Sequence, residues 1–308
     1  MPIKFVSKGF KTFTTVLAVG SMFASLFSFV VLADAGQVPK QVQTQARKDK
    51  PTVIALAPHI IENLFAVGAG EQVIGTTEHS DYPEAAKQVP RIGNYAVLQI
   101  EKILQLKPDY LVAWPTGNPP EDLVRVEKLG IPVVYSKPNE LEGVAEELIK
   151  FGELTGNQQQ AQLVADDYLQ KLKKIKQDNT DKKPIKVFYQ LWSAPLTTIA
   201  NQAWPQKILD VCKAQNPFVD LVGDYPHVSI ENVLVANPDV IIIPTSLTEP
   251  NGEIEYWQKF SSIPAVKNKQ IYLVNSDKLH RMTPRVVEEM QVLCDKIDTA
   301  RLFYANKS

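Results

Sequence analysis

The sequence predicts an α/β protein made of two related α/β lobes with mainly parallel sheets, joined by a long connecting helix, with a ligand cleft between the lobes. The first indication is a repeat: "QIEKILQLKPDYLVAW" (99–114) and "SIENVLVANPDVIIIP" (229–244) align without gaps. The copies share an Ile-Glu pair, a leucine and a Pro-Asp pair. In each copy a helical pattern stops before proline and an apolar run follows, which is typical of a helix leading into a buried parallel strand.

The second indication is that apolar runs and helical patterns alternate on both sides of each copy. Around the first copy we predict strands at 52–58, 72–76 and 131–136 and helices at 60–66 and 121–129. Around the second copy we predict strands at 185–191 and 270–276 and helices at 205–213 and 254–260. Such alternation indicates an α/β lobe, here present twice.

A long helical pattern at 139–177 separates the two repeats, with Gly156 as a point where it can break. A stiff connecting helix would restrict hinge motion between the lobes. The expected organisation is a signal peptide at 1–35, a flexible lead-in at 36–50, an N-terminal lobe at 51–138, the connecting helix at 139–177 and a C-terminal lobe at 178–308.

Composition sets limits on function. The 308 residues are enough for two domains, and a hydrophobic content of 44% is enough for real cores. The formal net charge is -1 and no basic block is present, so electrostatics give no reason to expect a nucleic-acid partner.

The N-terminus has the pattern of a targeting segment. Three lysines within the first 11 residues precede an uncharged apolar stretch at 12–33. Ala33 and Ala35 then form an A-x-A pattern, so cleavage is expected after one of them. No cysteine follows the stretch, so lipoprotein anchoring is not indicated. The alternative is an uncleaved membrane anchor, because the stretch is long enough to span a bilayer.

Aromatic and polar residues lie at the predicted strand ends or in nearby loops. Ligands bind at the carboxyl ends of the strands in open parallel sheets. The candidate ligand-binding residues are His79, Tyr82, Tyr95, Trp114, Trp192, Tyr225, Asp277, His280 and Arg281. Aromatic faces from both lobes suit a large flat or ring-shaped ligand whose orientation a few polar groups fix.

Catalytic and metal-binding motifs are missing. The sequence has no G-x-S-x-G, Walker A, H-E-x-x-H or G-x-G-x-x-G motif. His59, His79 and His280 map to strand ends and His227 to a loop, but their spacing is not that of a local metal motif. We therefore predict neither a metal site nor enzymatic activity; an exported metal-dependent enzyme with two α/β lobes is the alternative from another functional class.

The cysteines, Cys212 and Cys294, are the only two in the chain. In an exported protein such a pair suggests one disulfide, with two separate buried thiols as the alternative.

Four stretches carry a resemblance to a known family: "VIALAPHIIENLFAVGAGEQVIGTTEHSDYP", "LKPDYLVAWPTGN", "ILDVCKAQNPF" and "NSDKLHRMTPRVVEEMQVLC". From Pro51 onward the chain resembles the periplasmic vitamin B12-binding receptors of ABC importers. Siderophore and haem receptors share the first strand and the Pro-Asp strand, whereas the tryptophan after that strand and the cysteine contexts favour the B12 branch. A siderophore site would use more Arg and Lys than this one, which supplies mainly Arg281.

The resemblance implies a periplasmic monomer that binds cobalamin as a transported ligand, uses no cofactor and delivers the ligand to membrane permease subunits. Trp114 matches the cleft wall, residues 277–281 match a cobalamin-contacting segment, and the two cysteines match the family's disulfide. His79 stands where the family usually has Tyr, and His280 stands where an acidic residue is usual, while Tyr82 keeps the family's residue.

The resemblance also assigns Glu101 and Glu231 as docking glutamates, one on each lobe. They occupy the same position in the two copies of the repeat. The alternative is that both are ordinary glutamates at helix starts, where the helix dipole favours them.

Overall fold

The computed structural model describes residues 50–246 and 251–307. The predicted signal peptide, its cleavage after Ala33 or Ala35 and nearly all of the lead-in lie outside the described residues. Within the described ranges, no helix combines the length and apolar character that crossing a membrane requires.

The N-terminal lobe is built on a parallel four-stranded sheet in the order β2-β1-β3-β4. Its strands are β1 (Val53–Ala55), β2 (Val73–Thr76), β3 (Tyr110–Ala113) and β4 (Val133–Tyr135). Its helices are α2 (Pro58–Ala66), η1 (Gly70–Gln72), η2 (Glu84–Gln88), α3 (Ile100–Leu106) and α4 (Pro120–Lys128).

The C-terminal lobe contains a second parallel four-stranded sheet, in the order β10-β9-β5-β8. Its strands are β5 (Ile185–Tyr189), β8 (Ala214–Gln215), β9 (Val240–Thr245) and β10 (Ile271–Asn275), and an antiparallel hairpin joins β6 (Trp192–Ser193) to β7 (Leu196–Thr197). Its helices are α7 (Trp204–Val211), α8 (Ile230–Ala236), α9 (Asn251–Trp257), α10 (Pro264–Lys267), α11 (Ser276–Leu279) and α12 (Val286–Ala305). The sequence did not predict β8 or the hairpin.

The two sheets have the same topology, because β8-β5-β9-β10 repeats the order β2-β1-β3-β4. The helices of the repeated segment, α3 and α8, have seven residues each and end in left-handed residues, Lys107 at φ 48° and Asn237 at φ 50°. The Pro-Asp pair then joins neighbouring strands: a carboxylate oxygen of Asp109 accepts the Thr52 N–H (2.7 Å), and one of Asp239 accepts the Lys186 N–H (3.2 Å). The predicted α/β fold of two related lobes is confirmed.

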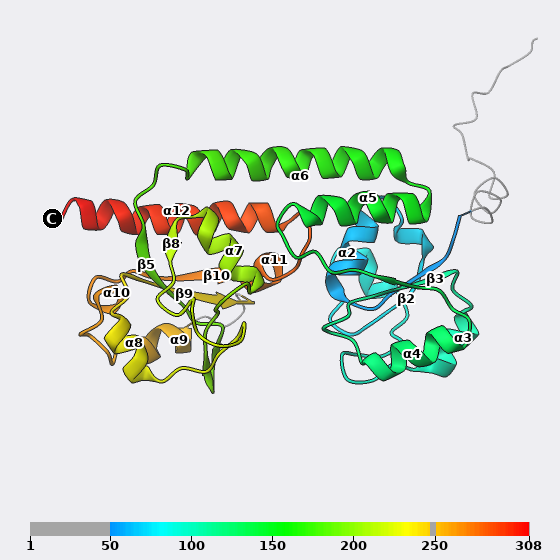
Figure 1. The fold of residues 1–308 in the computed structure, drawn as a ribbon, viewed down its shortest axis with the longest axis horizontal. Helices are drawn as coiled ribbons and strands as arrows, with labels where there is room; N and C mark the ends of the chain where they lie inside the picture. Colours follow the sequence, from blue (N-terminus) through cyan, green and yellow to red (C-terminus); the bar gives the residue numbers. More distant parts are fainter. Residues whose placement is uncertain (1–49, 247–250, 308) are drawn as a thin grey trace, which may run out of the picture.

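The predicted segment at 139–177 is helical, but it is not one continuous connecting helix, because it breaks at Gly156, the point that the sequence allows. The chain forms α5 (Gly143–Thr155), turns at Gly156 with φ 69°, and returns as α6 (Gln158–Asp178). Glycine suits the turn because a left-handed backbone costs it little. A Cβ at Gly152 would lie 2.3 Å from the Ala161 Cβ, so the two helices pack very closely. In Figure 1, α6 alone extends over both lobes, above α5 on one side and α12 on the other.

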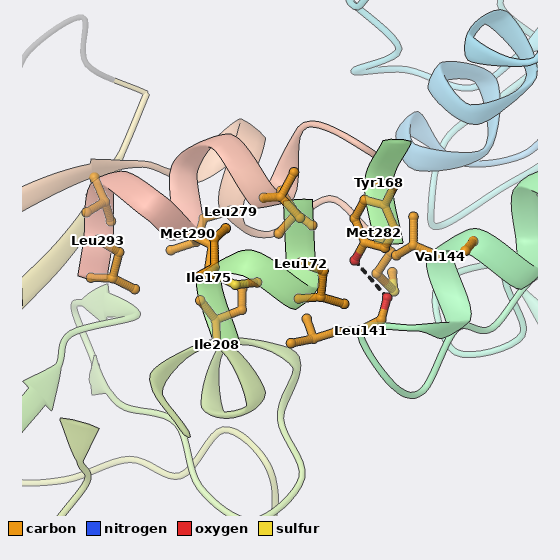
Figure 2. Packing of buried hydrophobic residues seen from close by; sticks show 14 of the residues in the cluster. Leu141, Val144, Tyr168, Leu172, Ile175, Ile208, Leu279, Met282, Met290 and Leu293 are labelled. Atoms are coloured by element: carbon orange, nitrogen blue, oxygen red, sulfur yellow. Dashed lines mark hydrogen bonds between the residues drawn. The ribbon is translucent and has the colours of Figure 1, made fainter. Parts of the chain in front are cut away.

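One buried apolar cluster continues through both lobes, including residues of β1, α2, α5, α6, α7 and α12. Figure 2 shows its centre, where Met282 lies between Tyr168 of α6 and Val144 of α5. The Tyr168 hydroxyl donates a hydrogen bond to the Leu141 carbonyl (2.7 Å), which satisfies its buried polar atom. Since the lobes share this core, their relative movement is restricted on the helical side.

Candidate functional site

Four of the candidate ligand-binding residues, His79, Tyr82, Asp277 and Arg281, lie where the N-terminal lobe meets residues 277–285, which we call the junction. Arg281 forms an ion pair with Asp81 of the opposite lobe (2.7 Å) and a longer one with Asp277 (3.5 Å). Arg281 also donates to the backbone carbonyl of His79 (3.4 Å). The structure therefore brings His79 of the N-terminal lobe to Arg281 and its partner Asp277, which lie 202 and 198 residues later in the sequence.

The next arginine, Arg285, makes the tightest contact between the lobes. Its guanidinium donates to both carboxylate oxygens of Glu62 on α2, at 2.6 and 2.5 Å. The same guanidinium lies 3.5 Å from the centre of the Tyr82 ring. Burial alone would lower the pKa of Arg285, but the hydrogen bond and the charge of Glu62 outweigh it, so the pKa is raised and the side chain stays charged.

Hydrogen bonds to Ser80 hold the loop that carries His79 and Tyr82. Arg91 donates to the Ser80 carbonyl (2.7 Å), and the hydroxyl groups of Ser80 and Thr76 lie 2.8 Å apart. His79 has a left-handed backbone (φ 64°) and an exposed side chain. The loop therefore presents His79 to solvent while turning its carbonyl toward Arg281.

Trp114 follows β3 and is partly buried. Its ring contacts the His59 ring edge-on, with centroids 5.3 Å apart. Gly117 leaves room for the indole, because a Cβ there would lie 1.9 Å from it. Burial, aided by the positive charge of Arg281, lowers the pKa of His59 to about 3, so this histidine is neutral at neutral pH. Trp114 therefore packs on a histidine that lies close to Arg281.

On the C-terminal side, a nitrogen of His280 lies 2.7 Å from the Tyr189 hydroxyl. Burial lowers the pKa of His280 to about 4, so it too is neutral near pH 7. The Tyr225 hydroxyl lies beside the backbone of Trp204, and burial and the charge of Asp224 raise its pKa. Both rings are therefore neutral and offer hydrogen-bonding groups without charge.

Two candidate residues are largely exposed side chains. Tyr95 is 77% exposed and Trp192, on the β6–β7 hairpin, is 65% exposed. Within the part of the chain that the structure describes, neither shares a hydrogen bond, ion pair or ring contact with the cluster around Arg281. The Trp192 indole N–H instead donates to the Ala194 carbonyl (3.1 Å).

Glu101 and Glu231 occupy the first turns of α3 and α8, and both side chains are exposed. The Ser229 hydroxyl hydrogen-bonds Glu231 and lowers its pKa, so this carboxylate is ionised at neutral pH. Equivalent exposed carboxylates on the two lobes are compatible with docking, which stays a prediction.

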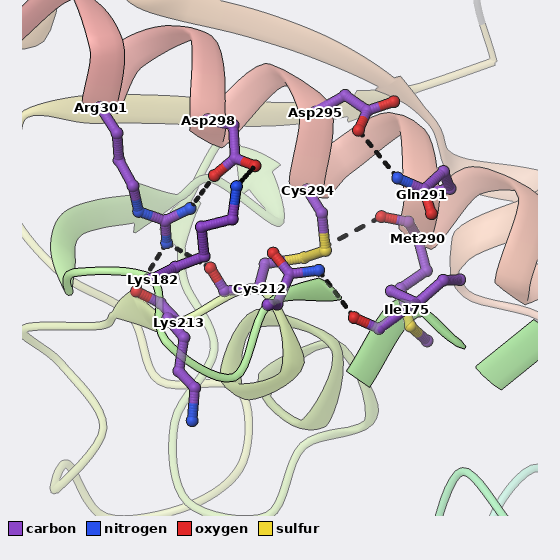
Figure 3. The surroundings of a disulfide bond; sticks show 11 residues. Ile175, Lys182, Cys212, Lys213, Met290, Gln291, Cys294, Asp295, Asp298 and Arg301 are labelled. Carbon is purple, nitrogen blue, oxygen red and sulfur yellow. Dashed lines mark hydrogen bonds and ion pairs between the residues drawn. A yellow bond between two sulfur atoms is a disulfide. The ribbon is translucent and has the colours of Figure 1, made fainter. Parts of the chain in front are cut away.

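The predicted disulfide is confirmed: Cys212 and Cys294 are bonded, with Cα atoms 4.9 Å apart. It joins the end of α7 to α12 (Figure 3). Arg301 of α12 strengthens this connection by donating to the carbonyls of Cys212 and Lys213 while pairing with Asp298.

Sequence reasoning missed Glu62, Asp81 and Arg285. A signal existed for Glu62, since a lone carboxylate in the apolar stretch "PHIIENLF" requires a buried partner. Arg285 lies four residues after Arg281, but nothing in the sequence indicates a partner 223 residues away. As for metals, residues 50–246 and 251–307 contain no group of three or more His, Cys, Asp or Glu side chains arranged to hold an ion.

Relatives that align with most of this chain are known. The chain is 35% identical over 249 residues to a vitamin B12-binding protein of Vibrio cholerae, covering 81% of this chain and 90% of the relative. It is 31% identical over 258 residues to a vitamin B12-binding protein of Vibrio parahaemolyticus, covering 84% and 93%. These relatives are binding proteins and not enzymes, in agreement with the prediction.

Solved structures share the architecture. The crystal structure of the periplasmic vitamin B12 binding protein BtuF of Vibrio cholerae matches with a TM-score of 0.76 at 34% identity, over 82% of this chain and 98% of that one. The periplasmic haem-binding protein BhuT with two haems matches with a TM-score of 0.74 at 19% identity, over 81% and 98%, a likeness of fold alone. Residues 53–278 match the family described as periplasmic binding protein. The chain belongs to the periplasmic binding protein family.

Proposed function

We propose that this protein is a periplasmic receptor that captures vitamin B12, or another cobalamin-class corrinoid, and delivers it to an ABC importer. The observation that carries the proposal is the match to the vitamin B12 binding protein of Vibrio cholerae, at 34% identity over 98% of that structure. The junction chemistry supports it. A corrin is a large ring with amide side chains, and the junction offers aromatic faces beside charged and neutral hydrogen-bonding groups.

In this proposal Trp114 and Tyr82 give apolar faces to the corrin, while Asp277 and Arg281 bind its amide groups. Arg281 already contacts three carboxylates and a carbonyl, so a ligand amide would add to these contacts or replace that of the half-exposed Asp81. The remaining candidates, His79, His280, Tyr95, Trp192 and Tyr225, would extend the contacts on both lobes.

Delivery would use Glu101 and Glu231, which we propose to meet basic residues of the membrane permease subunits. The receptor would act as a monomer in the periplasm after its signal peptide is removed behind Ala33 or Ala35. Two equivalent glutamates on a pseudo-symmetric receptor suit a two-fold symmetric transporter.

A direct binding test decides the ligand. Purified protein beginning at Gly36 is mixed with cyanocobalamin, desalted and examined for retained corrinoid absorbance, and the stoichiometry is measured by titration calorimetry. We expect one bound corrinoid per chain. No retained colour, together with tight binding of haem or of a ferric siderophore in parallel samples, would replace cobalamin with that ligand.

A further inference from the structure

An arginine of one lobe is inserted between two side chains of the other. Arg285 belongs to the C-terminal lobe, and both of its contacts, Glu62 and Tyr82, belong to the N-terminal lobe. Glu62 is only 3% exposed, so its carboxylate has little access to water. We call these three residues the inter-lobe clamp.

The clamp is directional as well as attractive. A guanidinium bound to both oxygens of one carboxylate is fixed in the plane of that carboxylate. Tyr82 covers the guanidinium face at 3.5 Å and fixes the remaining freedom. Because removal of one partner leaves a buried charge uncompensated, the lobes cannot separate here at small cost.

Neutral polar groups at the same junction are poorly satisfied. Among the described residues, six buried side-chain N or O atoms lack a hydrogen-bond partner, and three of these belong to His59, Asn63 and Thr283. His59 and Asn63 lie on α2 with Glu62, and Thr283 lies two residues before Arg285. Unsatisfied buried polar atoms favour a more open junction, in which water can reach them. The clamp acts against this opening.

The clamp also touches the residue proposed to bind the ligand. A carboxylate oxygen of Glu62 lies 3.7 Å from Arg281, whose other partners across the junction are Asp81 and the His79 carbonyl. Tyr82 gives one face to Arg285, so only its other face is free for a ligand. Lobe separation, the position of Arg281 and the free face of Tyr82 therefore depend on the same ion pair.

We propose that Glu62 and Arg285 are positioning residues which, with Tyr82, fix the separation of the lobes and thereby the width of ligand that the receptor accepts. The identity of the ligand rests on the proposed function, whereas the fixed separation does not.

The separation can be measured without a ligand. The native cysteines are bonded to each other, so Val124→Cys on α4 and Val235→Cys on α8, at exposed positions of the two lobes, can carry spin labels for pulsed dipolar spectroscopy. We expect one narrow distance distribution for the clamped protein. Arg285→Met should shift or broaden it by more than about 2 Å, on the scale of domain rearrangements. Arg285→Lys, which keeps the charge but loses the two-point contact, should give a smaller change.

The matched control is Arg301→Met, since Arg301 is also a largely buried, ion-paired arginine but lies within one lobe. It should leave the distance unchanged. An unchanged distribution in Arg285→Met would overturn the proposal. If Arg285→Met does not fold, as judged by near-ultraviolet circular dichroism, Tyr82→Ala tests the clamp with the ion pair retained and must still broaden the distribution, while Tyr82→Phe must not.

The ligand measurement is separate. If cobalamin binds the wild type, Arg285→Met should weaken it about tenfold, mainly through faster dissociation, and should reduce the discrimination against cobinamide, a corrinoid that lacks the nucleotide loop. Altered distances with unchanged affinity and unchanged discrimination would overturn the positioning role. A wild type that binds no corrinoid would refute the proposed function, while the distance measurement would still decide whether the clamp exists.

Discussion

The two lobes share a strand order but differ in what has been added to it. Both sheets repeat one topology, and both use the aspartate of the Pro-Asp pair to hold the first strand of the lobe. The C-terminal lobe alone carries the disulfide and the β6–β7 hairpin, whereas α2 of the N-terminal lobe supplies His59, Glu62 and Asn63 to the junction. Repeated features thus build the lobes, and unrepeated features build the junction between them.

One repeated feature does not fit that division. Asp109 and Asp239 bond to the backbone of neighbouring strands, so the fold explains their presence in both copies. Glu101 and Glu231 are exposed, and neither bonds to another strand or helix among the described residues. A role outside the fold would explain the repetition.

The largest effect is expected from reversing both charges. Glu101→Arg with Glu231→Arg should abolish transport and capture by the membrane permease, because loss of a buried interface charge pair costs about 2 to 5 kcal/mol per site. Each single variant should weaken capture to a lesser degree. The measurement is a pull-down with the permease beside a cobalamin titration, whose affinity should not change.

The matched control reverses Glu121 on α4 and Glu255 on α9, which are exposed glutamates on other helices of the two lobes. This variant should dock normally. Normal docking by the Glu101/Glu231 double variant would leave these glutamates as helix-dipole residues alone.

Removal of the disulfide measures how much a feature of the C-terminal lobe alone contributes to stability. Replacing Cys212 and Cys294 by Ala should lower the free energy of unfolding by roughly 4 kcal/mol, from the chain entropy of a loop closed over 82 residues. Both sulfurs are buried, so lost packing adds to this effect. Urea unfolding, followed by circular dichroism, gives the value.

The same unfolding curve tests cooperativity. Because one core continues through both lobes, the variant should still unfold in a single transition; a separate early transition would show that the lobes unfold independently.

Regular patterns allowed most of the lobes to be predicted, and long-range packing accounts for what was missed. The alternation of apolar and helical segments predicted the main strands of both sheets, but β8 has only two residues and no pattern of its own. Helical periodicity continues on both sides of Gly156, so the turn there is decided by the packing of α5 on α6. The site segment 277–281 was predictable, whereas its contact with Asp81 depends on how the lobes lie together.

Each lobe contains one histidine that burial keeps neutral, which gives a matched pair. His59 and His280 have folded pKa values of about 3 and about 4, below the value of 6.5 for an unfolded chain. The unfolded chain therefore binds more protons below pH 6.5, and stability is lost as the pH falls toward 4. At pH 5 this cost is about 2 kcal/mol per histidine.

Unfolding of His59→Gln, His280→Gln and the double variant between pH 7 and 4.5 checks the effect. Each substitution should flatten the loss of stability in acid, and the two should add. A single variant that keeps the full pH dependence would show that its histidine titrates normally in the folded protein.

Two tryptophans, Trp114 of the N-terminal lobe and Trp192 of the C-terminal lobe, are candidate ligand contacts that can be compared. Trp114→Ala should weaken cobalamin binding by about 2 kcal/mol, because it removes an aromatic wall at the junction. Trp192→Ala should cost less, since this ring is mostly exposed and packs against little of the protein. Titration calorimetry gives both values, and thermal unfolding shows whether the fold survives. A larger effect at Trp192 would move the centre of the site onto the C-terminal lobe.

The smallest effect is expected at the first residues of α3 and α8, because only α8 has a side-chain N-cap. Ser229 caps α8: its hydroxyl accepts the Asn232 N–H (3.3 Å), and the Asn232 side chain accepts the Ser229 N–H (3.0 Å). Gln99 makes no such side-chain cap for α3, and its own N–H already donates to the Ile92 carbonyl (2.8 Å).

Ser229→Ala should therefore cost about 1 kcal/mol of unfolding free energy, because it leaves a first-turn N–H without its partner and breaks the reciprocal bond. Gln99→Ala should change stability by less than about 0.5 kcal/mol, as at other exposed positions without a special role. Gln99→Ser should not reproduce the gain, since Lys102 stands where Asn232 completes the cap and cannot accept a hydrogen bond. Urea unfolding of the three variants measures the difference. Equal costs at Ser229 and Gln99 would mean that packing of the two short helices, and not their caps, determines where each begins.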